Sequence, residues 1–142
     1  MGRRESRERA LQILFQLEFD DKQEALSLDY FWEKKKSPDT EHTKKLVKGV
    51  ISNKDEIDSL IQSHSKNWRV SRMLYIDRNI LRLAVYELIF EEDIAVAVAI
   101  NEAVELAKKF GNNESAKFIN GILDALSKDP KTRKKNRGNT NG

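Results

Sequence analysis

The stretch of residues 76–90 constrains the fold most strongly, because its apolar side chains lie on most sides of a helix. A helix that is apolar nearly all round is buried in the core of a protein. The sequence therefore predicts a long helix at the centre of the fold. Its apolar positions are Ile76, Ile80, Leu81, Leu83, Ala84, Val85, Leu88 and Ile89.

The rest of the chain also has the pattern of helices. Apolar residues at helical spacing, among them Ala10, Leu14 and Leu17, predict the first one. Residues 94–100 are rich in β-branched residues, which favour a strand. They have no partner strand, so we expect them to lead into a helix. The predicted helices cover residues 4–19, 24–36, 38–51, a stretch from 53 onward, a stretch ending at 111, and 112–127, with a connector at 68–74 that carries a short helical turn.

Residues that favour helix ends mark several of these boundaries. Asn and Ser favour the position before a helix, Pro the first turn, and Gly the position after the last turn. The signals are Ser37 before Pro38, Asn53 with Glu56 as a capping box, Gly111 as a stop, and Asn112 or Asn113 as a start.

Composition excludes several functional classes. The chain has 142 residues, of which 39% are apolar, and this suffices for one domain with a core. It has no apolar run long enough to span a bilayer, and its start is arginine-rich rather than apolar, so we expect a cytoplasmic protein with no membrane contact. Cysteine is absent and only His42 and His64 are present. We therefore expect no disulfide, no metal site, no cofactor and no catalytic residue.

The net charge of +3 is unevenly distributed along the chain. Residues 128–142 hold six basic residues and one acidic residue, Asp129, and after Pro130 they contain no apolar residue. Such a segment cannot bury a core, so we predict a basic, disordered tail. The middle of the chain is acidic, and a nucleic-acid interpretation therefore has to place positive charge locally.

Three arginines near the start form a first candidate site. Arg3, Arg4 and Arg7 share one side of the predicted helix, whereas Arg9 lies on the opposite face, one turn after Glu5. Such a cluster suits contact with phosphates. It also fits an ordinary charged helix start, and composition alone favours that second interpretation.

A second candidate site lies in the last helix. Phe118 is at one edge of the apolar stripe, where a half-exposed ring could stack on an unpaired base, and Lys117 beside it suits a phosphate. Asn120 and Gly121 follow in the helix interior, where both are unfavourable. We interpret Gly121 as a packing residue and Asn120 as a packing or contact residue. A lone Phe is more often a core residue, so that alternative stays open.

These segments together resemble the bacterial NusB family of transcription antitermination factors. The resemblance rests on D-R-N-I-L-R-L-A-V-Y-E-L at residues 77–88, K-F-I-N-G-I-L-D at 117–124, residues 99–108, and the arginine-rich start, and it covers roughly residues 3–127. It implies an all-α, NusB-like domain over residues 1–127. This domain would consist of two small helical bundles, about 1–65 and 68–127, that share the central long helix.

The resemblance also implies a function. NusB proteins are non-enzymatic RNA-binding factors, which pair with NusE, a ribosomal protein of the small subunit. They recognise single-stranded boxA RNA in nascent ribosomal transcripts and join an RNA polymerase antitermination complex that suppresses premature termination. By this resemblance Asp77 and Arg78 face the protein partner, whereas Tyr86 and Glu87 are structural. The implied RNA-binding residues are Arg3, Arg4, Arg7, Lys117, Phe118 and Asn120, with the acidic Glu114 nearby.

Two other functions stay open. The chain could be a helical protein–protein adaptor whose arginines merely face solvent, and salt dependence of binding would separate this from RNA binding. It could also be an RNA-targeting domain detached from a ribosomal RNA cytosine methyltransferase. The sequence leaves open whether the protein is a monomer or a dimer.

Overall fold

The computed structural model describes residues 2–18 and 38–130, and every regular element within them is a helix. The predicted all-α fold is confirmed. The helix predicted over residues 24–36 and the part of the tail beyond residue 130 lie outside the described residues. The elements are α1 (Gly2–Leu17), α3 (Pro38–Ser52), α4 (Lys54–Ser63), the 3-10 turn η2 (Val70–Arg72), α5 (Tyr75–Phe90), α6 (Val96–Phe110) and α7 (Asn113–Lys128).

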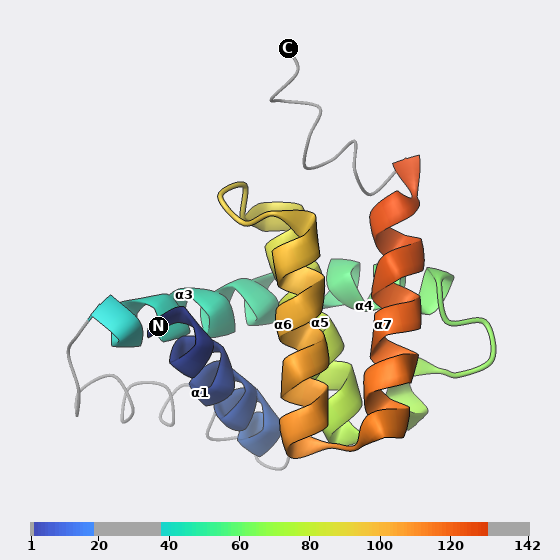
Figure 1. The fold of residues 1–142 in the computed structure, drawn as a ribbon, viewed down its shortest axis with the longest axis horizontal. Coiled ribbons are helices and arrows are strands. Elements are labelled where there is room, and N and C mark those ends of the chain that lie inside the picture. The colour runs from blue at the N-terminus through green and yellow to red at the C-terminus, as the bar shows by residue number, and fades with distance from the viewer. Residues whose placement is uncertain (1, 19–37, 131–142) are drawn as a thin grey trace.

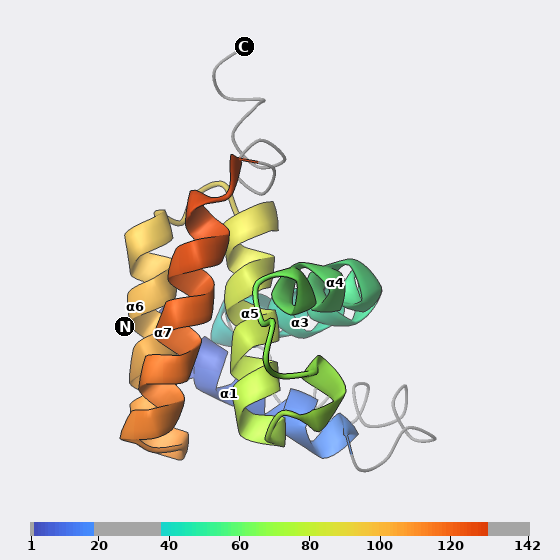
Figure 2. The same ribbon diagram turned by 90° about the vertical axis from the view of Figure 1, so that its right-hand side faces the viewer.

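Helix α5 lies at the centre of the molecule, as its apolar pattern predicts. Every residue from Asp77 to Ile89 is buried. Helices α6 and α7 pack on one side of α5, and α3 and α4 pack on the other (Figure 2). Two small groups of helices therefore share one long helix. The division near residues 65–68 stays a prediction. None of the described helices is long and apolar enough to cross a membrane.

The boundary between α6 and α7 follows the cap residues of the sequence. Helix α6 ends at Phe110 with Gly111 as its C-cap. Asn112 then caps α7, and its side-chain oxygen accepts a hydrogen bond of 2.8 Å from the backbone N–H of Ser115. The stretch 94–100 is helical from Val96 onward, so the expected helix is confirmed.

The capping box predicted at Asn53 is wrong. Helix α4 does begin directly after Asn53, but the Asn53 side chain makes no cap hydrogen bond. Its amide Nδ2 instead donates to the carbonyl of Gly49, 2.8 Å away, in the last part of α3. The side chain therefore closes the preceding helix rather than opening the next one.

Gly49 also sets how closely α3 approaches α5. A Cβ atom at this position would overlap the ring of Tyr86 on α5. Tyr86 is buried, as is Glu87 beside it, so the prediction that both are structural is confirmed. The missing side chain of Gly49 makes room for the tyrosine ring between the two helices.

Candidate nucleic-acid interface

Arg7, one of the three predicted RNA-binding arginines, lies inside the protein. Its Nε donates to both carboxylate oxygens of Glu87 on α5, at 3.1 and 2.9 Å. The two side chains are only 6% and 2% exposed. A second carboxylate, Glu102 of α6, lies 3.7 Å from Nη1. This corrects the expectation of a direct phosphate contact, because burial and the ion pair with Glu87 keep this guanidinium away from a ligand.

Arg3 and Arg4 do reach the surface, at the first turn of α1. The Arg4 guanidinium donates to both oxygens of Glu102, at 3.0 and 2.7 Å, while its side chain remains 55% exposed. The hydrogen bond from Arg4 lowers the pKa of Glu102 and keeps this carboxylate ionised. The ion pair between α1 and α6 thus holds the Arg4 guanidinium in place and leaves it exposed.

Arg3 is positioned by a histidine of α3. Its Nη1 lies 2.9 Å from Nε2 of His42. Burial, followed by the positive charge of Arg3, lowers the pKa of His42 to about 4. His42 is therefore neutral near pH 7, and its Nε2 can accept the hydrogen bond that Arg3 donates.

Two of the three predicted residues of α7 line a groove between α6 and α7. Lys117 and Asn120 are exposed and line this groove, which has a volume of about 550 Å³. Phe118 is half-buried and packs against the core with part of its ring, so it has the edge position that the sequence predicts. The other lining residues are Ala97, Ile100, Asn101, Val104, Lys108, Asn113 and Ala116.

Gly121 does not pack against another helix, and that prediction is wrong. The residue is exposed, and a Cβ atom built on it would meet no atom of the described residues within 4 Å. The sequence correctly marks the position as unusual for a helix interior, but the reason lies outside the packing of the described helices.

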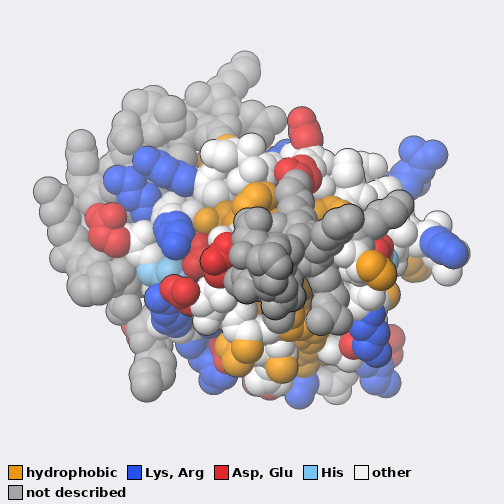
Figure 3. All heavy atoms as spheres, turned by 90° about the horizontal axis from the view of Figure 1, so that it is seen from above, with side chains coloured by type: hydrophobic (Ala, Val, Ile, Leu, Met, Phe, Trp, Pro, Cys, Tyr) orange, Lys and Arg blue, Asp and Glu red, His pale blue; other side chains and the backbone are white. Residues whose placement is uncertain are grey.

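The exposed arginines and the α7 residues belong to neighbouring elements. Figure 1 shows α6 and α7 side by side, and the Arg4–Glu102 pair ties the start of α1 to α6. The end of the molecule seen in Figure 3 carries interspersed basic and acidic side chains. This end of the molecule is therefore not a uniformly basic face. The arrangement offers guanidinium groups, an ammonium group, an aromatic ring and amides.

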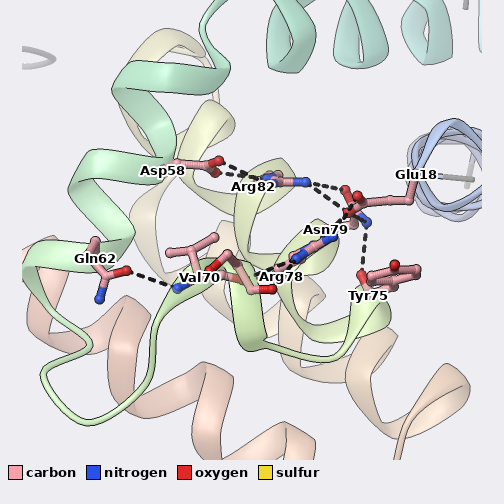
Figure 4. A network of polar contacts seen from close by, with 9 residues as sticks. Glu18, Asp58, Gln62, Val70, Tyr75, Arg78, Asn79 and Arg82 are labelled. Atoms are coloured by element: carbon pink, nitrogen blue, oxygen red, sulfur yellow. Dashed lines mark hydrogen bonds and ion pairs between the residues drawn. The ribbon is translucent and has the colours of Figure 1, made fainter. Parts of the chain in front are cut away.

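Arg78, predicted to face a protein partner, is bound within the molecule instead. Its Nε and Nη2 each donate to Glu18 at 2.7 Å, and its Nη1 donates to the carbonyls of Val70 and Ser71 at 3.3 and 3.1 Å (Figure 4). The guanidinium also lies over the Tyr75 ring, 4.5 Å from its centroid. These contacts correct the prediction, because Arg78 holds the start of α5 together.

Asp77 is buried beside a shallow apolar hollow that the sequence analysis missed. Its Oδ1 has no hydrogen-bond partner among the described residues, and burial raises the pKa of Asp77, which a hydrogen bond with Ser115 partly opposes. Leu74 and Tyr75 border the same hollow, of about 560 Å³, and are 67% and 37% exposed. In the sequence, Leu74 and Tyr75 could have been recognised as an apolar pair directly before the apolar helix predicted over residues 76–90.

Comparison with known proteins identifies the family. A sequence model of the NusB family matches residues 4–128. The transcription antitermination protein NusB of Myxococcus xanthus (strain DK1622) is 50% identical over 132 residues, covering 89% of this chain and 94% of that protein. NusB of Bacillus subtilis (strain 168) is 41% identical over 129 residues, covering 91% of this chain and 97% of that protein.

Solved structures agree with this. T. maritima NusB has a TM-score of 0.82 and 40% sequence identity, and the match covers 89% of this chain and 91% of that one. A crystal structure of the antitermination factors NusB and NusE in complex with dsRNA has a TM-score of 0.79 at 31% identity, covering 89% of this chain and 96% of that one. The chain therefore belongs to the NusB family of transcription antitermination proteins, which are not enzymes.

Proposed function

We propose that this protein binds single-stranded boxA RNA together with NusE. The complex joins RNA polymerase in the cytoplasm and suppresses premature termination in nascent ribosomal transcripts. Family membership supports the role in antitermination, and the related NusB that was crystallised with NusE and dsRNA supports both kinds of partner. Recognition of RNA breaks no covalent bond, so this function needs no catalytic residue and no cofactor.

The observation that carries the RNA interface is the half-buried Phe118 of α7, one position after Lys117. Its buried part fixes the ring, and its exposed part can stack on a base of an unpaired strand. Lys117 supplies a cation for a phosphate, and the Asn120 amide can read a base edge. Arg3 and Arg4 extend the surface with two further phosphate contacts, while Arg7 fixes the helix that carries them.

NusE is proposed to bind at the start of α5. The apolar hollow around Leu74 and Tyr75 is large enough for side chains of a partner, and aromatic residues are enriched where protein interfaces bind tightly. Asp77 lines the same hollow, so a partner bound there would lie beside it.

Binding of a boxA RNA and a scrambled RNA, at two salt concentrations, tests the RNA interface. Phe118→Leu keeps an apolar side chain but removes the ring, and we expect it to weaken boxA binding by about 1–3 kcal/mol. Arg3→Gln and Arg4→Gln should each weaken binding and reduce the slope of log K against log salt by about 0.7. Lys54→Gln, an exposed cation on α4, is the control and should change neither value.

The outcomes separate the competing functions. Preference for boxA RNA that increases with NusE supports the proposal. Equal, salt-sensitive binding to both RNAs would reduce the protein to a general polyanion binder. Binding of NusE without any RNA binding would leave only a protein–protein adaptor.

Leu74→Ser tests the partner surface separately. Serine is favourable before a helix, so the start of α5 should be retained while apolar contact area is lost. We expect NusE affinity to fall by more than about 1 kcal/mol, as for a central interface residue, with RNA binding of the isolated protein unchanged. Val98→Ser, which removes an exposed apolar side chain from α6, should leave NusE affinity intact.

A further inference from the structure

Helix α7 carries a glycine in its middle that no contact among the described residues requires. Gly121 is exposed, and no described atom lies in the space that a side chain would fill. Glycine is less favourable than alanine in a helix interior. Asn120 directly before it is also exposed and disfavoured in a helix. Neither residue gains burial in return.

Gly49, within α3, and Gly111, the C-cap of α6, differ from Gly121. At Gly49 the ring of Tyr86 occupies the place of a side chain. At Gly111 a Cβ atom would lie 2.9 Å from the carbonyl oxygen of Ala107 and 3.0 Å from Oγ of Ser115. Both glycines therefore satisfy a packing need inside the protein, whereas no contact among the described residues accounts for Gly121.

We propose that Gly121 is the point at which a nucleotide of single-stranded RNA rests directly on the backbone of α7. This inference depends on the proposed RNA binding and adds a residue that determines how closely the RNA approaches. Lys117 and Phe118 lie one turn before Gly121 on the same side of the helix, and Asn120 is adjacent. The ammonium group suits a phosphate, the ring a base face, and the amide a base edge. A nucleotide fits this combination better than a protein segment does.

Close approach explains why a side chain is absent here. The Phe118 ring is half-buried and so held low on the helix surface. A base can stack on it only if the ribose and phosphate come close to the helix backbone. A Cβ atom at position 121 would lift the nucleotide from α7 and separate the base from the ring.

Gly121→Ala and Gly121→Leu test this, with boxA RNA affinity and melting temperature as readouts. Both residues are better helix formers than glycine and enter empty space, so the melting temperature should rise. Gly121→Ala should nevertheless weaken boxA binding about tenfold, and Gly121→Leu should weaken it more. The slope of log K against log salt should stay at the wild-type value, because no charge is lost.

Ser59→Ala and Ser59→Leu on the exposed side of α4 provide matched controls and should bind RNA like the wild type. Wild-type affinity in both Gly121 variants would overturn the inference while leaving the proposed function in place. A loss of NusE binding with RNA binding intact would also overturn it. Failure of the wild-type protein to bind any RNA would overturn the proposed function together with the inference.

Discussion

Three arginines within five positions of one helix have different roles because they differ in burial. Arg3 and Arg4 remain at the surface, whereas Arg7 is enclosed with Glu87. A buried ion pair contributes little net stability, but removing one partner leaves an uncompensated charge. Loss of function after substitution of Arg7 would therefore reflect loss of structure rather than loss of a phosphate contact.

Arg7→Ala should lower the free energy of unfolding at neutral pH by about 3–5 kcal/mol, because Glu87 loses its partner. Burial raises the pKa of Glu87, and Arg7 opposes this rise, so the pKa should be higher still in the variant. A raised pKa gives stability that is present at low pH and lost as the pH rises through the folded-state pKa. The penalty should therefore shrink on acidification, as urea unfolding at several pH values can measure.

Glu87→Gln in the Arg7→Ala background provides the control. The double variant has no unpaired charge at position 87, so it should recover part of the lost stability and the difference from wild type should no longer shrink on acidification. A penalty for Arg7→Ala that is small and independent of pH would contradict the buried ion pair.

Gly49→Ala is expected to destabilise the protein, although alanine is the better helix former. The new methyl group would overlap the Tyr86 ring, so α3 and α5 would have to separate. Such overpacking typically costs about 1–3 kcal/mol. Chemical denaturation can measure the loss, and Ser52→Ala on the exposed end of the same helix serves as control. An unchanged or increased stability would show that the two helices are not in close contact here.

At the scale of elements, the turn between α6 and α7 decides where the residues of the groove lie. Asn112 fixes the start of α7 through its hydrogen bond to the N–H of Ser115. Lys117, Phe118 and Asn120 follow within the next two turns, so their direction depends on where the helix begins. The cap therefore acts on the candidate interface without belonging to it.

Asn112→Ala should lower the free energy of unfolding by about 1 kcal/mol, the usual value of an N-cap side chain. Asn113→Ala, one position later and within the helix, removes an exposed amide that caps nothing and should leave stability nearly unchanged. Thermal unfolding of the two variants distinguishes them. Equal effects would mean that the cap hydrogen bond contributes no stability.

At the scale of the whole molecule, one polar network ties three helices together. Glu18, after the end of α1, accepts hydrogen bonds from Arg78, Asn79 and Arg82 of α5 (Figure 4). Arg82 in turn donates to both carboxylate oxygens of Asp58 on α4, at 2.8 and 2.9 Å. The network thus joins α1, α4 and α5.

Glu18→Gln should reveal this network through its pH dependence. Burial tends to raise the pKa of Glu18, but its hydrogen bonds to Arg78 and Asn79 and the charge of Arg82 outweigh burial, so the pKa is lowered. A lowered pKa gives stability that is present above the ordinary value of 4.5 and is lost as the pH falls through the folded-state pKa. At neutral pH the free energy of unfolding of the wild type should exceed that of the variant by about 2 kcal/mol. This difference should vanish in acid, and a difference that persists there would contradict the prediction.

The sequence by itself located several of the described helices and helix boundaries. The apolar pattern of residues 76–90 located the central helix, because a helix that is apolar nearly all round has to be covered. Gly111 and Asn112 located a helix boundary, because their local backbone and hydrogen-bond preferences act over a few residues. The edge position of Phe118 followed from helical spacing alone.

Only the tertiary structure decided which charged residues are available to a ligand. The sequence motifs predict RNA contact for Arg3, Arg4 and Arg7 alike. They predict contact with a protein partner for both Asp77 and Arg78. Glu87, which pairs with Arg7, lies 80 residues away from it in the chain, and Glu18, which pairs with Arg78, lies 60 residues away. The open space at Gly121 likewise depends on tertiary structure, because no other described helix packs against this side of α7. Helical spacing reports which residues share a side of one helix, whereas burial and ion pairing depend on other helices, whose positions follow from the packing of the whole core.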